Sequence, residues 1–303
     1  MIQYLNALKQ VLDNGEVRDD RTGVGTISLF GMQQRYNLAE SFPAVTTKRL
    51  AWKACVGELL WMIEGSGNER RLAEITHGTA EGKTTIWTPN AQAPYWKPKA
   101  KFDGDLGRVY GVQWRHWRTP VEHKAEEFKD DFGTWYNRKG SVHFKEVDQL
   151  TDLINGIKQD PYGRRHIISA WNPGELEAMA LPPCHVFAQF YVGKDNRLSC
   201  QLYQRSCDMF LGVPFNIASY SLLTHLIAQV CNLEVGEFVH VLGDAHIYLN
   251  HVEQVKEQLD REPLPAPQLL LNRDITDITK FTMADINLDG YTSHASIKAA
   301  MAV

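Results

Sequence analysis

Residues 185–231 carry the pattern that most constrains the fold of this chain. Side chains alternate in 185–192 with the period of a strand. One side of this segment would present Val186, Ala188, Phe190 and Val192, and the other His185, Phe187, Gln189 and Tyr191. Residues 193–196 supply turn chemistry, so 197–205 is expected to return as the second strand of a hairpin. Apolar residues then recur at helical spacing in 217–231. Antiparallel strands and long helices in one core predict an α+β fold.

The chain is interpreted as one domain over 1–303 with two surface insertions. Residues 52–64 are typical of a buried helix closed by Gly65, and 166–171 of a further strand. The stretch 88–105 carries prolines and lysines, and 118–148 is polar and mixed in charge. Both are expected to be enlarged surface loops rather than independent domains.

Composition argues against several classes of function. No window approaches about eighteen uninterrupted apolar residues, so no membrane span is expected. The net charge of −4 over 303 residues gives no sign of a DNA-binding surface. Five cysteines without a Cys-x-x-Cys pair argue against disulfides and zinc, so we expect no metal and a cytoplasmic location. The N-terminus lacks the basic region and cleavage site of a signal and is interpreted as mature structure.

Cys184 is the candidate nucleophile. It follows two prolines at the entrance of the first hairpin strand. A thiol attacks only as the thiolate, so a reactive cysteine needs cationic or hydrogen-bonding neighbours that lower its pKa. Strand alternation turns His185 to the opposite face, whereas Arg205, at the end of the partner strand, can supply the positive charge. The alternative is an inert core cysteine, which is our interpretation of Cys55 and Cys231.

Four arginines and a hydroxyl lie at loop or strand-end positions. They are Arg21, Arg164, Arg165, Arg205 and Ser206. Taken singly, each arginine is more often a turn residue or a solvated one. Guanidinium groups match phosphate oxygens in a bidentate way, so together these residues suggest a phosphate site.

Glu58 and Asn216 are polar candidates on helices. The helical neighbours of Glu58 are mostly apolar, and an unpaired buried carboxylate would cost several kcal/mol, so either its pKa is raised or a polar network holds it. A structural hydrogen bond to an arginine is the alternative. Asn216 follows Pro-Phe at the start of a helix and could be a cap. Its amide could equally read a uracil edge, which presents the O4 acceptor and the N3–H donor.

Residues 244–248 place Asp244, His246 and Tyr248 on one face of a strand. Metal ligation is one interpretation of this spacing. With only one suitably placed histidine, a hydrogen-bonding role is favoured.

These residues belong to motifs that closely resemble folate-dependent thymidylate synthase, in the right order over essentially the whole chain. The matching stretches are 20–23, 58–61, 109–114, 183–185, 204–208, 210–220, 243–251 and 301–303. The resemblance implies a mixed β-sheet flanked by helices and a homodimer whose sheets pack back to back. It also implies the substrate dUMP and the one-carbon donor 5,10-methylenetetrahydrofolate.

The resemblance further implies roles for individual residues. The groups expected at the reacting atoms are Cys184 (the nucleophile at C6), Glu58, Tyr110, His185, Asp208 and Asn216. The nucleotide would be held by Arg21, Arg205, Ser206, Asn216, His246 and Tyr248, with Arg164 and Arg165 donated by the other subunit. The folate would contact Trp87, Asp208, Gly212, Phe215 and Val303.

The implied reaction is a reductive methylation, because attack at C6 turns C5 into a carbon nucleophile. Three departures from the family pattern stand out: Thr88 follows Trp87 where an acidic residue is usual, Arg108 replaces a proline, and the insertions at 88–105 and 118–148 enlarge surface loops, the first of them next to the folate side. A looser lid after Trp87 would favour 5-hydroxymethylation of dUMP, or of dCMP, in which water captures the exocyclic methylene. The amide at Asn216 favours dUMP over dCMP, since cytosine-using relatives tend to carry aspartate there.

Two other classes stay open as alternatives. One is a non-catalytic nucleotide-binding or RNA-regulatory protein, which would have no use for a nucleophile such as Cys184. The other is a cysteine hydrolase, for which no histidine and acid are convincingly spaced. Product analysis with dUMP and methylenetetrahydrofolate separates them.

Overall fold

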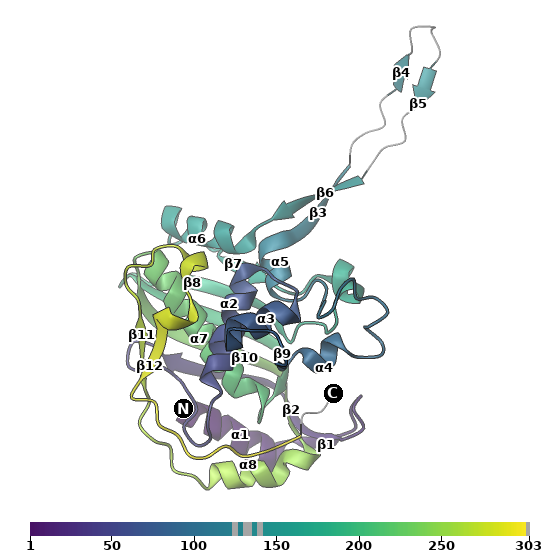
Figure 1. Ribbon diagram of the computed structural model, residues 1–303. Helices are drawn as coiled ribbons and strands as arrows, with labels where there is room; N and C mark the ends of the chain where they lie inside the picture. The colour runs from purple at the N-terminus through teal and green to yellow at the C-terminus, as the bar shows by residue number, and fades with distance from the viewer. Residues whose placement is uncertain (123–126, 130–134, 138–141, 301–303) are drawn as a thin grey trace.

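A six-stranded sheet forms the centre of the computed structural model, which describes residues 1–122, 127–129, 135–137 and 142–300 (Figure 1). In spatial order its strands are β1 (Glu16–Arg18), β2 (Thr26–Asn37), β10 (Glu234–Tyr248), β9 (Arg197–Asp208), β8 (His185–Val192) and β7 (Ile167–Ser169). All neighbours pair antiparallel except β9 and β10, which run parallel. The sheet is therefore mixed, as expected. The predicted hairpin of 185–192 and 197–205 is confirmed as β8 and β9.

Helices pack against this sheet and against one another. They are α1 (Ile2–Asn14), α2 (Trp52–Glu64), α3 (Glu69–His77), α4 (Thr88–Ala91), α5 (Gly111–His116), α6 (Gln149–Gln159), α7 (Gly212–Val230) and α8 (Val252–Leu259). The long α7 connects β9 to β10 and packs on both strands, and α2 packs on α7, α3 and α5. Such a parallel pair needs a long crossover, which α7 supplies. One contiguous apolar core lies between the sheet and these helices, so the α+β prediction is confirmed.

The ends of two helices bear on the site. The prediction of a helix over 52–64 is confirmed, and Gly65 closes it in the left-handed conformation with φ 78°. In contrast, α7 begins at Gly212, with Leu211 as its N-cap, so Asn216 lies inside the helix. The capping interpretation of Asn216 is therefore wrong, and its side chain is available for other contacts.

Strand β8 departs from strict alternation at its start. Its register with β9 shifts between His185 and Phe187, as at a β-bulge. As a result His185 is 7% exposed and joins the buried face, whereas Val186 is only partly buried. Grouping His185 with Phe187, Gln189 and Tyr191 was therefore wrong, because a bulge changes the face that the flanking side chains take.

The other face of the sheet is open at β7, β8 and β9. Phe187 and Tyr203 stack there with ring centroids 6.0 Å apart. Tyr191 is 67% exposed and Ile167 is 43% exposed. A sheet face with several large apolar side chains in solvent is typical of an interaction surface.

The two predicted insertions differ in structure. Much of 88–105 is at the surface, but Trp96 is 3% exposed and its indole Nε1 donates to the Asp105 carbonyl at 2.6 Å. This indole anchors the segment on the core. In 118–148, strands β3 (Trp117–Glu122) and β6 (Val142–Val147) pair as a hairpin that projects from the body, and β4 (Glu127–Lys129) and β5 (Trp135–Asn137) pair farther out (Figure 1).

A small separate sheet, β11 (Gln268–Leu271) with β12 (Ile286–Asp289), precedes the C-terminal segment, and short 3-10 turns lie at Pro173–Ala178, Leu249–His251, Ile278–Lys280 and Met283–Asp285. None of the described helices is both long enough and apolar enough to cross a bilayer.

Candidate active site

A cavity of about 340 Å³ lies where α2, α3, β8 and the start of α7 meet. Eight of the predicted residues line it: Glu58, Trp87, Tyr110, His185, Asp208, Gly212, Phe215 and Asn216. They come from segments that are up to about 160 residues apart in the sequence. Only the tertiary packing of α2 against α7 brings them together.

Cys184 stands directly before β8, beside this cavity. Its backbone N–H donates to the Tyr110 hydroxyl at 2.8 Å, and its carbonyl accepts from the Arg205 N–H at 2.9 Å. The Arg205 guanidinium donates to the carbonyls of Pro183 and Pro182 at 2.9 and 3.0 Å. Both sides of the strand entrance are thus held in place around the thiol.

The pKa of Cys184 is raised overall, because burial outweighs its favourable neighbours. The positive charge of Arg205 and hydrogen bonds from Ser206 and Tyr110 lower the pKa, and Asp208 raises it further. The prediction that Arg205 supplies a positive charge that stabilises the Cys184 thiolate agrees with this effect on the pKa. The expectation of a lowered pKa is not met, because burial outweighs these neighbours.

Tyr110 occupies an unusual backbone conformation with φ 31° and ψ −91°. It precedes α5, whose first residue, Gly111, lies so close to α2 that a Cβ would stand 2.3 Å from the Met62 carbonyl. A backbone conformation like that of Tyr110 costs on the order of 1–3 kcal/mol, and residues in such conformations cluster at functional sites. Here it aims the buried Tyr110 hydroxyl at Cys184.

Glu58 is hydrogen-bonded to an indole rather than to an arginine. Trp87 Nε1 donates to Glu58 Oε1 at 2.6 Å. Burial raises the pKa of Glu58, and the Trp87 hydrogen bond opposes that shift only in part. The raised pKa matches the expectation for a carboxylate on an apolar helix face, and the arginine alternative is wrong.

The segment on either side of Trp87 is held by a carboxylate that the sequence did not single out. Glu69 Oε1 accepts from the hydroxyls of Thr85 and Thr88 at 2.7 and 2.6 Å, and Oε2 accepts from Arg70 Nε at 2.6 Å. Thr88 therefore replaces the usual acidic residue with a side chain that is itself tied down. This finding argues against a looser lid after Trp87.

Arg108, the second departure from the family pattern, is 9% exposed and pairs with Glu175 at 2.7 Å. Its guanidinium also donates to the His116 carbonyl. It therefore has a structural explanation within this chain.

A hydrogen-bonded chain of four polar side chains ends at the cavity. His240 Nε2 contacts Gln204 Oε1 at 2.8 Å, Gln204 Nε2 donates to Asn216 Oδ1 at 2.9 Å, and Asn216 Nδ2 contacts His185 Nε2 at 2.7 Å. Burial lowers the pKa of both His185 and His240 to about 3, so both rings are neutral. Sequence reasoning missed Gln204 and His240. Each could have been found from the sequence as a polar residue on the inward face of an otherwise apolar strand.

Strand register places the predicted sugar-binding residues beside Asp208. His246 of β10 pairs with Asp208 of β9. Burial would lower the pKa of His246, but hydrogen bonding to Asp244 and the charge of Asp208 raise it overall. The rings of His246 and Tyr248 meet at 5.3 Å.

Burial also raises the pKa of Tyr248, to about 12; Asp208 adds to the shift and the charge of Arg21 opposes it. Arg21 is exposed in its glycine loop yet close enough to act on Tyr248. The predicted nucleotide-binding groups on β9, β10 and this loop therefore lie near one another.

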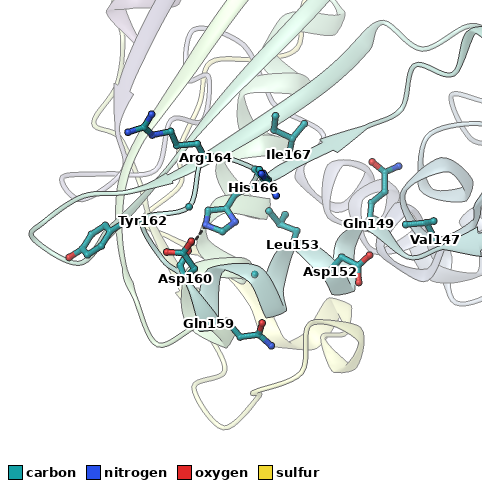
Figure 2. A pocket seen from close by; sticks show the side chains of 13 residues that line it. Val147, Gln149, Asp152, Leu153, Gln159, Asp160, Tyr162, Arg164, His166 and Ile167 are labelled. Atoms are coloured by element: carbon teal, nitrogen blue, oxygen red, sulfur yellow. Dashed lines mark hydrogen bonds between the residues drawn. The ribbon is translucent and has the colours of Figure 1, made fainter.

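Arg164 and Arg165 are not brought to this cavity within the chain. Both are exposed and line a separate open hollow of about 720 Å³ beside α6 and β7. Figure 2 shows Arg164 extending from this segment, while His166 turns toward Asp160, whose carbonyl it contacts at 2.8 Å. The two arginines precede β7, the edge strand of the open sheet face.

Two further predictions concern the C-terminus and metals. Val303 lies outside the described residues, so its role at the folate side stays a prediction. Within the described ranges, no group of three or more histidine, cysteine or acidic side chains could hold a metal ion.

Comparison with known proteins relates this chain to one family, both by a family model and by individual relatives. The sequence matches the family described as thymidylate synthase over residues 2–303. It is similar to the thymidylate synthase of Equine herpesvirus 2 (strain 86/87), with 49% identity over 305 residues that cover 99% of this chain and 98% of the viral protein. It is also 49% identical over 304 residues to the bifunctional dihydrofolate reductase-thymidylate synthase of Zea mays, covering 99% of this chain. The chain spans 54% of that maize protein, or about half its length.

Proposed function

Because the chain belongs to the thymidylate synthase family, we propose that it is a methyltransferase that converts dUMP to dTMP with 5,10-methylenetetrahydrofolate and releases dihydrofolate. One observation carries this proposal: Cys184 lies beside a single cavity and is hydrogen-bonded to Tyr110 in its wall. The carboxyl, amide, imidazole and phenol groups that the reaction needs line the same cavity, together with aromatic side chains.

Cys184 is the proposed nucleophile. Its sulfur would form a bond to C6 of the pyrimidine, which makes C5 reactive toward an electrophilic carbon. Arg205 and Ser206 stabilise the thiolate, since both lower the pKa of Cys184 against the effect of burial. Arg21, Arg205 and Ser206 would also hold the 5′-phosphate, and His246 and Tyr248 the deoxyribose hydroxyl.

Glu58 is suited to moving the C5 proton. A buried carboxyl whose pKa is raised holds a proton more readily than a free one, so it can both accept and return a proton. Tyr110 and His185 lie in the same cavity wall and would order water there together with Glu58. Asn216 would read the uracil edge.

The cavity fits a flat heteroaromatic ring, since its lining combines Trp87, Phe215 and several aliphatic side chains with the carboxylate of Asp208. Trp87, Asp208, Gly212, Phe215 and Val303 would hold the folate, which supplies a one-carbon unit and then a hydride when bound. Glu69, through Thr85 and Thr88, keeps the Trp87 wall in place and helps to exclude water.

A homodimer is part of the proposal. The open face of β7, β8 and β9 carries exposed aromatic and aliphatic side chains that a second copy would cover. Arg164 and Arg165 stand at the edge of this face and away from the cavity of their own chain. They would complete the phosphate site of the other subunit. The five free cysteines are compatible with a cytoplasmic location.

One assay tests the function against its runner-up, 5-hydroxymethylation. The chain is incubated with dUMP and methylenetetrahydrofolate, the nucleotide product is analysed by mass spectrometry, and dihydrofolate is followed by absorbance. We expect dTMP and an equal amount of dihydrofolate. A hydroxymethyl nucleotide without dihydrofolate would overturn the methylation assignment, and absence of any turnover would overturn both.

A further inference from the structure

The backbone carbonyl of Ser206 orients the series of hydrogen bonds that runs from His240 through Gln204 and Asn216 to His185. Gln204 Nε2 donates to the Ser206 carbonyl at 2.9 Å and to Asn216 Oδ1 at 2.9 Å. A carbonyl can only accept, so the amide nitrogen of Gln204 has to face it. Both hydrogens of that nitrogen are thereby used, and the Gln204 oxygen has to face His240.

This orientation determines where the protons sit on both histidines. The Gln204 oxygen accepts, so His240 carries its proton on Nε2, which lies 2.8 Å away. Asn216 Oδ1 accepts from Gln204, so Asn216 Nδ2 donates to His185 Nε2 at 2.7 Å. Nε2 of His185 then bears no proton, and the ring proton of His185 is on Nδ1, a buried atom without a partner among the described residues.

The same orientation selects the pyrimidine that Asn216 can pair with. After its two internal contacts, the amide keeps one N–H and one oxygen lone pair. These match the O4 acceptor and the N3–H donor of uracil. Cytosine presents a donor and an acceptor in the reverse order, so an amide turned by 180° would match cytosine instead.

We propose that His240 is a positioning residue: together with the Ser206 carbonyl, it keeps Asn216 in the orientation that selects uracil over cytosine. Its Nε2–H holds the Gln204 amide, and Gln204 holds the Asn216 amide in the orientation that complements uracil. His240 is fully buried in β10, so it acts only through Gln204. The part of this proposal that concerns uracil and cytosine rests on the proposed function. The position of the proton on the His185 ring does not depend on it.

The first experiment reads that proton position directly. Nitrogen-15 NMR of the histidine rings is recorded on the whole unaltered protein without nucleotide. We expect the His185 proton on Nδ1 and the His240 proton on Nε2. A His185 ring protonated on Nε2 overturns the proposal, whether or not the protein proves to bind dUMP.

The second experiment measures dissociation constants for dUMP and dCMP by calorimetry. His240→Phe and His240→Leu remove the donor with two different shapes, and His240→Gln keeps an N–H donor near the position of Nε2. A lost hydrogen bond corresponds to about a tenfold change in affinity, so we expect the preference for dUMP to fall about tenfold in the first two variants. We expect His240→Gln to restore it and to leave the His185 proton on Nδ1.

His225→Leu is the matched control. His225 is another largely buried histidine, on α7, and packs on Phe42 with ring centroids 6.0 Å apart. We expect this variant to lose stability without a change in nucleotide preference. A folded His240→Phe or His240→Leu variant with an unchanged preference overturns the proposal. If neither folds, the His240 ring in the unaltered protein decides it: a proton on Nδ1 instead of Nε2 would mean that no N–H holds the Gln204 oxygen, and overturns the proposal.

Discussion

Glu58 of α2 and Glu69 of α3 are two carboxylates on neighbouring helices with different surroundings. Glu58 stands in the cavity wall and, among the residues that the structure describes, accepts one hydrogen bond, from Trp87. The Glu69 side chain is 1% exposed and accepts from Thr85, Thr88 and Arg70. Burial raises the pKa of Glu58, whereas for Glu69 the hydrogen bonds and the charge of Arg70 outweigh burial and lower the pKa.

The number of donors therefore separates a group suited to proton transfer from a structural one. A carboxyl with few donors keeps its proton to higher pH and can exchange it. A carboxylate with several donors is held ionised and ties segments together. Both act on Trp87: Glu58 receives its indole N–H, and Glu69 holds the threonines beside it.

Loss of the nucleophile should have the largest effect at the cavity. We expect Cys184→Ser to lower turnover by on the order of 10⁴-fold or more, with dUMP affinity within about tenfold of the unaltered value. Single-turnover assays and calorimetry measure the two quantities. Cys231→Ser, at the end of α7, is the control and should retain turnover. Substantial dTMP formation by Cys184→Ser would remove the covalent step from the mechanism.

Glu58→Gln tests the proton-transfer side of the comparison. We expect kcat to fall about 10²–10³-fold, the usual contribution of a positioned acid or base. In the unaltered protein kcat should climb as pH rises through the raised pKa of Glu58, and the variant should lack this limb.

The stability of Glu58→Gln should not fall at neutral pH. A raised pKa in the folded state means stability that is present at low pH and is lost as pH rises through that pKa. Denaturant unfolding at pH 8 measures this. A marked loss of stability there, with the acid limb intact, would place Glu58 with the structural carboxylates.

Arg165→Ala extends the comparison to the exposed arginines. We expect the KM for dUMP to rise about 10–100-fold, as for a lost hydrogen bond to a charged group, while kcat changes less. Mixing this variant with Cys184→Ser should bring back the low KM for dUMP, because one site of a mixed dimer then holds both intact residues. If mixed samples keep the raised KM, the arginine is not shared between subunits.

Glu69→Gln should have the smallest effect on catalysis. We expect the free energy of unfolding at pH 7 to fall by about 1–3 kcal/mol, because buried donors lose their charged acceptor, and kcat to change less than about tenfold. A lowered pKa gives stability that is present above the ordinary value of 4.5 and is lost as pH falls through the folded value. The difference from the unaltered protein should therefore vanish in acid. A loss of kcat as large as for Glu58→Gln would break the comparison.

Local periodicity was enough to predict several elements and their functional ends. The bounds of α2 and β8, the hairpin to β9 and the position of Cys184 at a strand entrance follow from patterns within about twenty residues. The motifs also identified eight of the residues that line the cavity.

The tertiary structure decided what those residues touch. The β-bulge at His185 reverses its face, and the early start of α7 frees Asn216 from capping. Glu58 meets Trp87 across 29 positions, and Gln204 meets His240 across 36. By itself the sequence determined the elements, the fold class and the chemical groups, since these depend on short-range spacing. Which carboxylate keeps its proton, which way an amide points and which arginines lie apart depended on packing between distant segments.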